Sequence, residues 1–150
     1  MSEMLANQYF MARKYQQAAV ELEKSLQHSP KSKVIRSKLI ICYTQLNETQ
    51  KAWNLFVPLV REDFEFIMNM DPIHDDCPCP ELVDDIDRKI ERHGKTAEQY
   101  LNAGMIWLYC DIDNSIAYLE KAFQLDHQIE SLGKVINVLR NYVDSPSMTL

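Results

Sequence analysis

Two cysteines separated by one proline, Cys77 and Cys79, follow His74 closely and form the group of residues most suited to chemistry in this sequence. Two thiolates and an imidazole supply three ligands for zinc or another soft metal. Structural zinc sites usually use paired half-sites, so His93 or Cys110 would have to complete this one through the fold. The two cysteines could also form a redox-active pair. The interpretation we favour is a turn whose cysteines have no chemical role.

The rest of the sequence does not indicate catalysis. It contains no nucleophile elbow, no Gly-rich phosphate loop and no H-E-x-x-H motif. Asp84, Asp85 and Asp87 resemble a group for acid–base work, but acids in this arrangement are typical of a solvated helix face. The sequence therefore predicts a protein that is not an enzyme.

The charge distribution limits the classes of partner. The net charge is −6, and residues 71–91 alone contain eight acids and two bases, so the remainder is formally neutral. Nucleic acid and anionic membranes both require a basic surface, which this chain lacks. No apolar run is long enough to cross a bilayer. We therefore predict a partner that is another protein or a peptide.

Cysteine usage and the first residues bear on location. The chain has four cysteines, and the sequence opening at Met1 does not resemble a secretory signal. An even number of cysteines without such a signal does not by itself predict disulfides. We therefore predict reduced cysteines and a cytoplasmic location.

Apolar residues recur at helical spacing along most of the chain, which indicates an all-α protein. Pro58 lies inside one of the helical segments and removes the hydrogen bond to the Asn54 carbonyl, so we expect a kink or an early end there. Residues 71–80 contain three prolines and are predicted to form a loop. The predicted helices are residues 4–12, 15–28, 34–46, 50–66, 81–92, 97–109, 114–125 and 128–143.

The first two helix pairs repeat each other at a fixed offset. Tyr9 and Tyr43 stand 34 positions apart, and so do Ala18 and Ala52. This period is typical of stacked helix–turn–helix units. A third copy of the pattern lies in residues 96–128, where CDIDNSIAYLEKAFQLDH is its clearest part.

These residues resemble the tetratricopeptide repeat family. The resemblance implies a right-handed superhelical stack of helical hairpins, with repeats at about 1–32, 33–66 and 96–128. Residues 67–95 would be an acidic loop plus a helix, either an insertion or a degenerate repeat. Residues 128–143 would be a capping helix and 144–150 a flexible tail. We expect one domain over residues 1–143.

The resemblance also implies a concave groove lined by the first helix of each repeat. In repeat three, the small residue of the pattern is either Ala103 or Gly104, and the second alignment moves the groove positions there by one. Some relatives grip a terminal carboxylate with a set of Lys, Asn and Arg residues that this chain mostly lacks. The predicted groove residues are Asn7, Phe10, Met11, Ser37, Lys38, Ile41, Thr44, Gln45, Leu101, Gly104 and Leu108.

The leading functional prediction is a non-catalytic adaptor or scaffold that binds an extended peptide or an amphipathic helix in this groove. A second hypothesis is a metal- or redox-responsive module that uses the His74, Cys77 and Cys79 loop. A third is a homodimer with a structural role.

Overall fold

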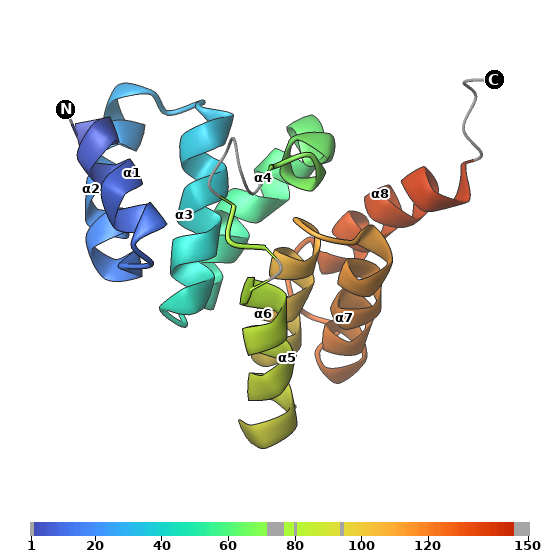
Figure 1. The fold of residues 1–150 in the computed structure, drawn as a ribbon. Coiled ribbons are helices and arrows are strands. Elements are labelled where there is room, and N and C mark those ends of the chain that lie inside the picture. Colours follow the sequence, from blue (N-terminus) through green and yellow to red (C-terminus); the bar gives the residue numbers. More distant parts are fainter. Residues whose placement is uncertain (1, 72–76, 80, 94, 146–150) are drawn as a thin grey trace. The chain divides into compact units, whose positions relative to one another are not determined.

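The computed structural model describes residues 2–71, 77–79, 81–93 and 95–145. These residues form eight α-helices and no β-strand (Figure 1), which confirms the all-α prediction. The contacts divide the chain into two compact units, Met1–Pro78 and Cys79–Leu150, and each unit is described separately. Within the described ranges, no helix combines the length and apolar character of a membrane-spanning segment.

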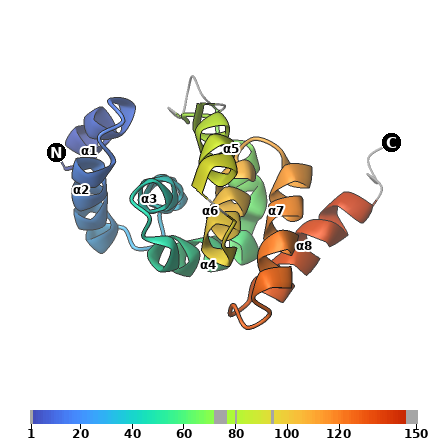
Figure 2. The same cartoon turned by 90° about the horizontal axis from the view of Figure 1, so that it is seen from below.

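Unit 1 consists of two helical hairpins. The first pairs α1 (Ser2–Met11) with α2 (Tyr15–His28), and the second pairs α3 (Lys33–Gln45) with α4 (Thr49–Met68). The hairpins lie side by side because α2 packs against α3 (Figures 1 and 2). This is the arrangement that the 34-residue offset predicts.

Local sequence sets the ends of these helices. Arg13 and Asn47 adopt positive φ angles of 63° and 59° and turn the chain between the two helices of each hairpin. The hydroxyl oxygen of Ser32 accepts a hydrogen bond from the Ile35 amide at 3.2 Å and caps α3.

The core of unit 1 shows what the repeated residues do. Ala18 and Ala52 are fully buried and allow the two helices of each hairpin to approach closely. Leu39 is fully buried, whereas its counterpart Leu5 is exposed. The difference follows from the stacking, because α3 lies against α2 of the preceding hairpin while α1 has no such neighbour among the described helices.

The bend predicted at Pro58 occurs elsewhere. Helix α4 runs through Pro58, and its non-helical residue is Asp63, with φ −169° and ψ 76°. Pro58 and Asn54 both lie on the exposed face of α4, where water can satisfy the carbonyl that lacks its donor. The carboxylate of Asp63 accepts a hydrogen bond from the Phe66 amide at 3.2 Å, so Asp63 caps the segment that follows it.

Unit 2 contains α5 (Glu81–His93), α6 (Ala97–Trp107), α7 (Ile112–Leu125) and α8 (Leu132–Asp144). Helices α6 and α7 form a hairpin, with α5 packed on α6 and α8 on α7. Helix α8 begins later than the predicted residue 128, because the chain turns at Ser131, which has a φ of 67°. Thr96 and Gln99 form a capping box at the start of α6.

Gly104 sets the separation between α6 and α7. The Ser115 hydroxyl donates a hydrogen bond of 2.6 Å to the Gly104 carbonyl oxygen. A Cβ atom at Gly104 would stand 2.5 Å from the Leu119 side chain. Gly104 is therefore the small residue at the helix crossing, which decides between the two alignments of repeat three.

Candidate functional site

Most of the predicted groove residues are buried. Met11 is exposed to 56%, while Asn7 and Gln45 are half-buried. The buried members of the predicted set are Phe10, Ser37, Lys38, Ile41, Thr44, Leu101, Gly104 and Leu108. The accessible part of the groove in unit 1 therefore lies on α1 and at the C-terminal end of α3.

The middle of helix α3 is buried on all of its faces, whereas Val34 near its start is exposed and Gln45 at its end is half-buried. Every residue from Ile35 to Thr44 is buried. Helices α2 and α4 pack against it, and α1 reaches it through Lys38. The predicted groove positions Ser37, Lys38, Ile41 and Thr44 are therefore covered by neighbouring helices.

Lys38 is the most unusual residue of this face. Lys38 is only 5% exposed. Its ammonium donates a hydrogen bond of 2.9 Å to the amide oxygen of Asn7 on α1. The same ammonium lies 5.5 Å from the centre of the Phe10 ring. Among the described residues, no carboxylate forms an ion pair with Lys38. A buried cation held only by a neutral amide and an aromatic ring is poorly compensated.

Gln45 presents a second incomplete donor. Its amide nitrogen Nε2 is buried and has no hydrogen-bond partner among the described residues. Gln45 follows Lys38 by seven positions, which places both side chains on the same face of α3, two turns apart. This face therefore combines two nitrogen donors that could bind oxygen acceptors of a ligand.

The edge of this site on α1 carries an apolar surface. Met4 is exposed to 70% and, with Asn7 and Met11, follows the spacing of one helix face. The sequence analysis identified Asn7 and Met11 but missed Met4. The spacing of three and then four residues could have indicated it.

In unit 2, the prediction for Gly104 is wrong, because Gly104 lies against Leu119 of α7 and not in a groove. The alternative alignment moves the groove position from Leu101 to Asn102. Asn102 is 8% exposed, and its amide oxygen has no hydrogen-bond partner among the described residues. The structure therefore favours the shifted positions on α6.

The cysteine cluster contains a disulfide that the sequence did not predict. Cys79 forms a disulfide with Cys110, and their Cα atoms lie 6.3 Å apart. Cys77 is a buried thiol, and His74 lies outside the described residues. No group of three or more His, Cys, Asp or Glu side chains in the described ranges is placed to hold a metal. The prediction of reduced cysteines is wrong for Cys79 and Cys110, because the fold brings together two residues 31 positions apart.

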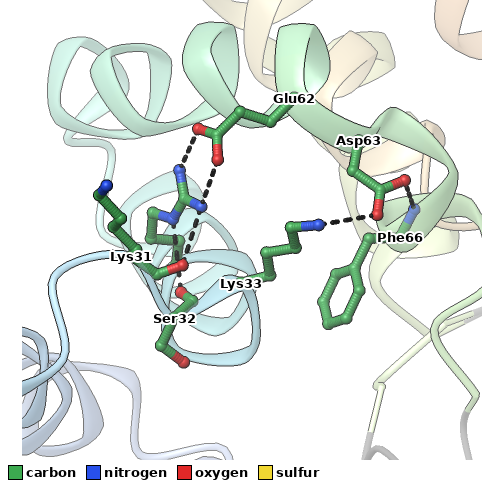
Figure 3. A network of polar contacts seen from close by, with 7 residues as sticks. Lys31, Ser32, Lys33, Glu62, Asp63 and Phe66 are labelled. Carbon is green, nitrogen blue, oxygen red and sulfur yellow. Dashed lines mark hydrogen bonds and ion pairs between the residues drawn. The ribbon is translucent and has the colours of Figure 1, made fainter.

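A polar network joins the start of α3 to α4 (Figure 3). The buried guanidinium of Arg36 donates hydrogen bonds of 2.8 and 3.0 Å to the two carboxylate oxygens of Glu62. It also donates to the carbonyl oxygen of Lys31 at 3.0 Å, and the Lys33 ammonium pairs with the Asp63 carboxylate at 3.0 Å. The hydrogen bonds from Arg36 lower the pKa of Glu62. This network holds the N-terminal end of α3 against α4. Sequence periodicity gave no signal for it.

A second polar cluster lies in unit 2. The carboxylate oxygen Oδ1 of Asp87 accepts hydrogen bonds from the Trp107 indole at 3.1 Å and from the Tyr118 hydroxyl at 2.7 Å. Burial and the hydrogen bond with Asp87 raise the pKa of Tyr118. Asp87 therefore connects α5 to both α6 and α7. The sequence had indicated only an acid on a solvated helix face.

Comparison with known protein families gave one match. A family model described as "Tetratricopeptide repeat" matches residues 9–65, which extend from α1 into α4. The comparisons with curated proteins and with solved structures returned no significant match. The matched segment includes the whole of α2 and α3 and parts of α1 and α4.

Proposed function

We propose that this chain is a non-catalytic adaptor that holds a peptide segment of another protein against α1 and α3, since residues 9–65 match the tetratricopeptide repeat family model. Repeats of this family generally mediate protein–protein interaction. The net charge of −6 supports a protein partner over a nucleic acid.

The observation that carries the proposal is the contact between Lys38 and Asn7. The ammonium group has three N–H donors, and one of them is used by the Asn7 amide oxygen. A buried cation gains free energy when an oxygen acceptor approaches it, because burial has removed most of its water. A peptide carbonyl or a side-chain carboxylate supplies such an acceptor.

The spacing of the donors suggests an extended ligand. Lys38 and Gln45 are seven residues apart, which corresponds to about 10.5 Å along a helix. An extended chain covers this distance with about three residues. One peptide segment can therefore offer acceptors to both side chains.

The α1 surface supplies the apolar part of the interaction. Met4 and Met11 are exposed on either side of Asn7, and methionine adapts readily to different apolar side chains. The peptide would enter over this edge, place an apolar side chain against the two methionines and direct an acceptor toward Asn7 and Lys38.

Selection from a library of random peptides tests the proposal directly. We expect the full-length chain to enrich peptides, and Lys38→Met to weaken their binding about tenfold, which is the effect of losing one charge-assisted hydrogen bond. Lys38→Met retains most of the buried volume. The matched control is Lys24→Met, which removes an exposed lysine of α2 that pairs with Glu21.

Two results would contradict the proposal. One is that the library yields no enriched peptides against a folded chain. The other is that the enriched peptides bind wild type and Lys38→Met equally well, which would place the binding surface elsewhere.

A further inference from the structure

The four cysteines divide into two classes. Cys79 and Cys110 are partly exposed and are joined by a disulfide. Cys42 and Cys77 are buried thiols. Burial raises the pKa of Cys42 to about 12, which leaves almost no thiolate at neutral pH. The bond that small thiols can reach is therefore the one between Cys79 and Cys110.

The position of this bond determines what it holds. Cys79 precedes the first residue of α5, Glu81, by two positions. Cys110 lies in the turn between α6 and α7. The disulfide therefore attaches the N-terminal end of α5 to the turn that joins α6 and α7, and α5 packs on α6 of this hairpin.

Helix α5 is also held without the covalent bond. Leu82, Ile86 and Ile90 are buried along one face of the helix. The Asp87 carboxylate accepts hydrogen bonds from Trp107 and Tyr118. When the disulfide is broken, the buried face of α5 and the hydrogen bonds of Asp87 remain. We therefore expect α5 to be held less tightly but not to detach.

We propose that the Cys79–Cys110 disulfide is a reversible redox link that controls how tightly α5 is held on α6 and α7. This inference is independent of the peptide-binding proposal, because the disulfide and the three helices that it concerns lie in unit 2.

The exchange chemistry needs a low-molecular-weight thiol and its disulfide. In the reducing direction, an external thiolate attacks one sulfur of the pair and releases the other cysteine as a thiolate. A second external thiol resolves the mixed disulfide, so two thiols become one small disulfide and both cysteines gain a proton. Oxidation is the reverse, in which the small disulfide accepts the two electrons.

The first experiment establishes the bond. The full-length chain is equilibrated in glutathione buffers of stepped redox poise, alkylated and digested without reductant. We expect a peptide that links Cys79 to Cys110 to disappear and return as the poise is cycled. Irreversible loss, or failure to detect the linked peptide under any oxidising condition, would overturn the proposal.

The second experiment measures the consequence. Hydrogen exchange of α5 is followed by mass spectrometry in oxidised and reduced protein, together with tryptic cleavage at Arg88, Lys89 and Arg92. Because a disulfide closes loops in the open state, we expect exchange and cleavage in α5 to become roughly tenfold faster on reduction. Unchanged exchange in α5 would show that the bond controls nothing there.

Two variants sharpen this comparison. Cys79→Ala/Cys110→Ala should behave like the reduced wild type in either buffer. Cys42→Ala removes a buried thiol and should keep the full response to reductant. The wild-type comparison stands without them if either variant fails to fold.

Discussion

Leu119 of α7 fills the space directly beside Gly104 of α6. A Cβ atom at Gly104 would stand 2.5 Å from Cδ2 and 2.6 Å from Cγ of Leu119, and 3.3 Å from its backbone nitrogen. The first two contacts are with a side chain that can move, but the third is with the backbone. The two helices must therefore separate if Gly104 gains even one methyl group.

Gly104→Ala should lower the stability of unit 2. We expect a loss of about 1–3 kcal/mol from overpacking, which exceeds the gain of about 1 kcal/mol from replacing glycine inside a helix. Hydrogen exchange of α6 and α7 in increasing urea measures the change in unit 2, because tryptophan fluorescence would also report Trp53 of unit 1. The matched control is Gly133→Ala in α8, where the nearest atom is the Phe123 ring at 3.7 Å. That variant should be neutral or slightly stabilised, and an equal loss in both would contradict the account of Gly104.

The pair formed by Arg36 and Glu62 should make the stability of unit 1 depend on acid pH. The hydrogen bonds from Arg36 hold the pKa of Glu62 in the folded state below its unfolded value. The stabilisation is therefore fully present above the unfolded pKa and is lost as the pH falls through the lower pKa of the folded state. We expect the urea midpoint of wild type to fall below about pH 4.5, near the ordinary carboxyl range. Glu62→Gln should flatten this part of the profile, whereas Glu65→Gln should leave it unchanged.

Asp63 should be required for the last part of α4. Asp63→Ala removes the oxygen that accepts from the Phe66 amide, and loss of such a cap costs about 1 kcal/mol. We expect faster hydrogen exchange in residues 66–68. Asp63→Asn keeps a capping oxygen but loses the charge that pairs with Lys33, so its exchange should stay close to that of wild type. Equal exchange in all three proteins would show that the cap does not hold this segment.

Tyr118 should ionise at higher pH than an ordinary tyrosine. Its pKa is raised by burial and by Asp87, so the associated stability is present at neutral pH and is lost as the pH rises above about 10. Asp87→Asn should lower the pKa of Tyr118, because an amide lacks the negative charge that opposes phenolate formation. Alkaline titration of phenolate absorbance checks this, with Tyr118→Phe identifying the contribution. A titration curve unaffected by Asp87→Asn would contradict the assignment.

The fold was largely predictable because its determinants are local. Ala18, Ala52 and the other repeated residues mark helix contacts at a fixed period, and caps such as Ser32 mark helix starts. The bend predicted at Pro58 does not occur, because the free-energy cost of a proline inside a helix depends on whether the freed carbonyl is exposed to water, which a sequence does not show. The disulfide was missed for a related reason, since Cys79 and Cys110 become neighbours only after α5 and α6 pack together.

The candidate site was predicted less completely than the fold. The repeat pattern assigns Lys38 to a face of α3, but it carries no information on what else covers that face. The contact between Lys38 and Asn7 depends on a distance between two hairpins. The hydrogen bonds of Asp87 likewise join three helices, so no local pattern distinguishes this residue from its solvated neighbours.

The burial of residues 35–44 of α3 has a consequence for which positions of unit 1 tolerate substitution. These buried positions tolerate few substitutions, because a change of side-chain volume there alters the packing of the neighbouring helices. The ten-residue helix α1 is restricted in this way only at buried positions such as Ala6 and Phe10, whereas Met4, Leu5 and Met11 are exposed. Under the proposed function, a change of partner would therefore involve the exposed positions of α1, while residues 35–44 of α3 keep the Lys38 ammonium in place.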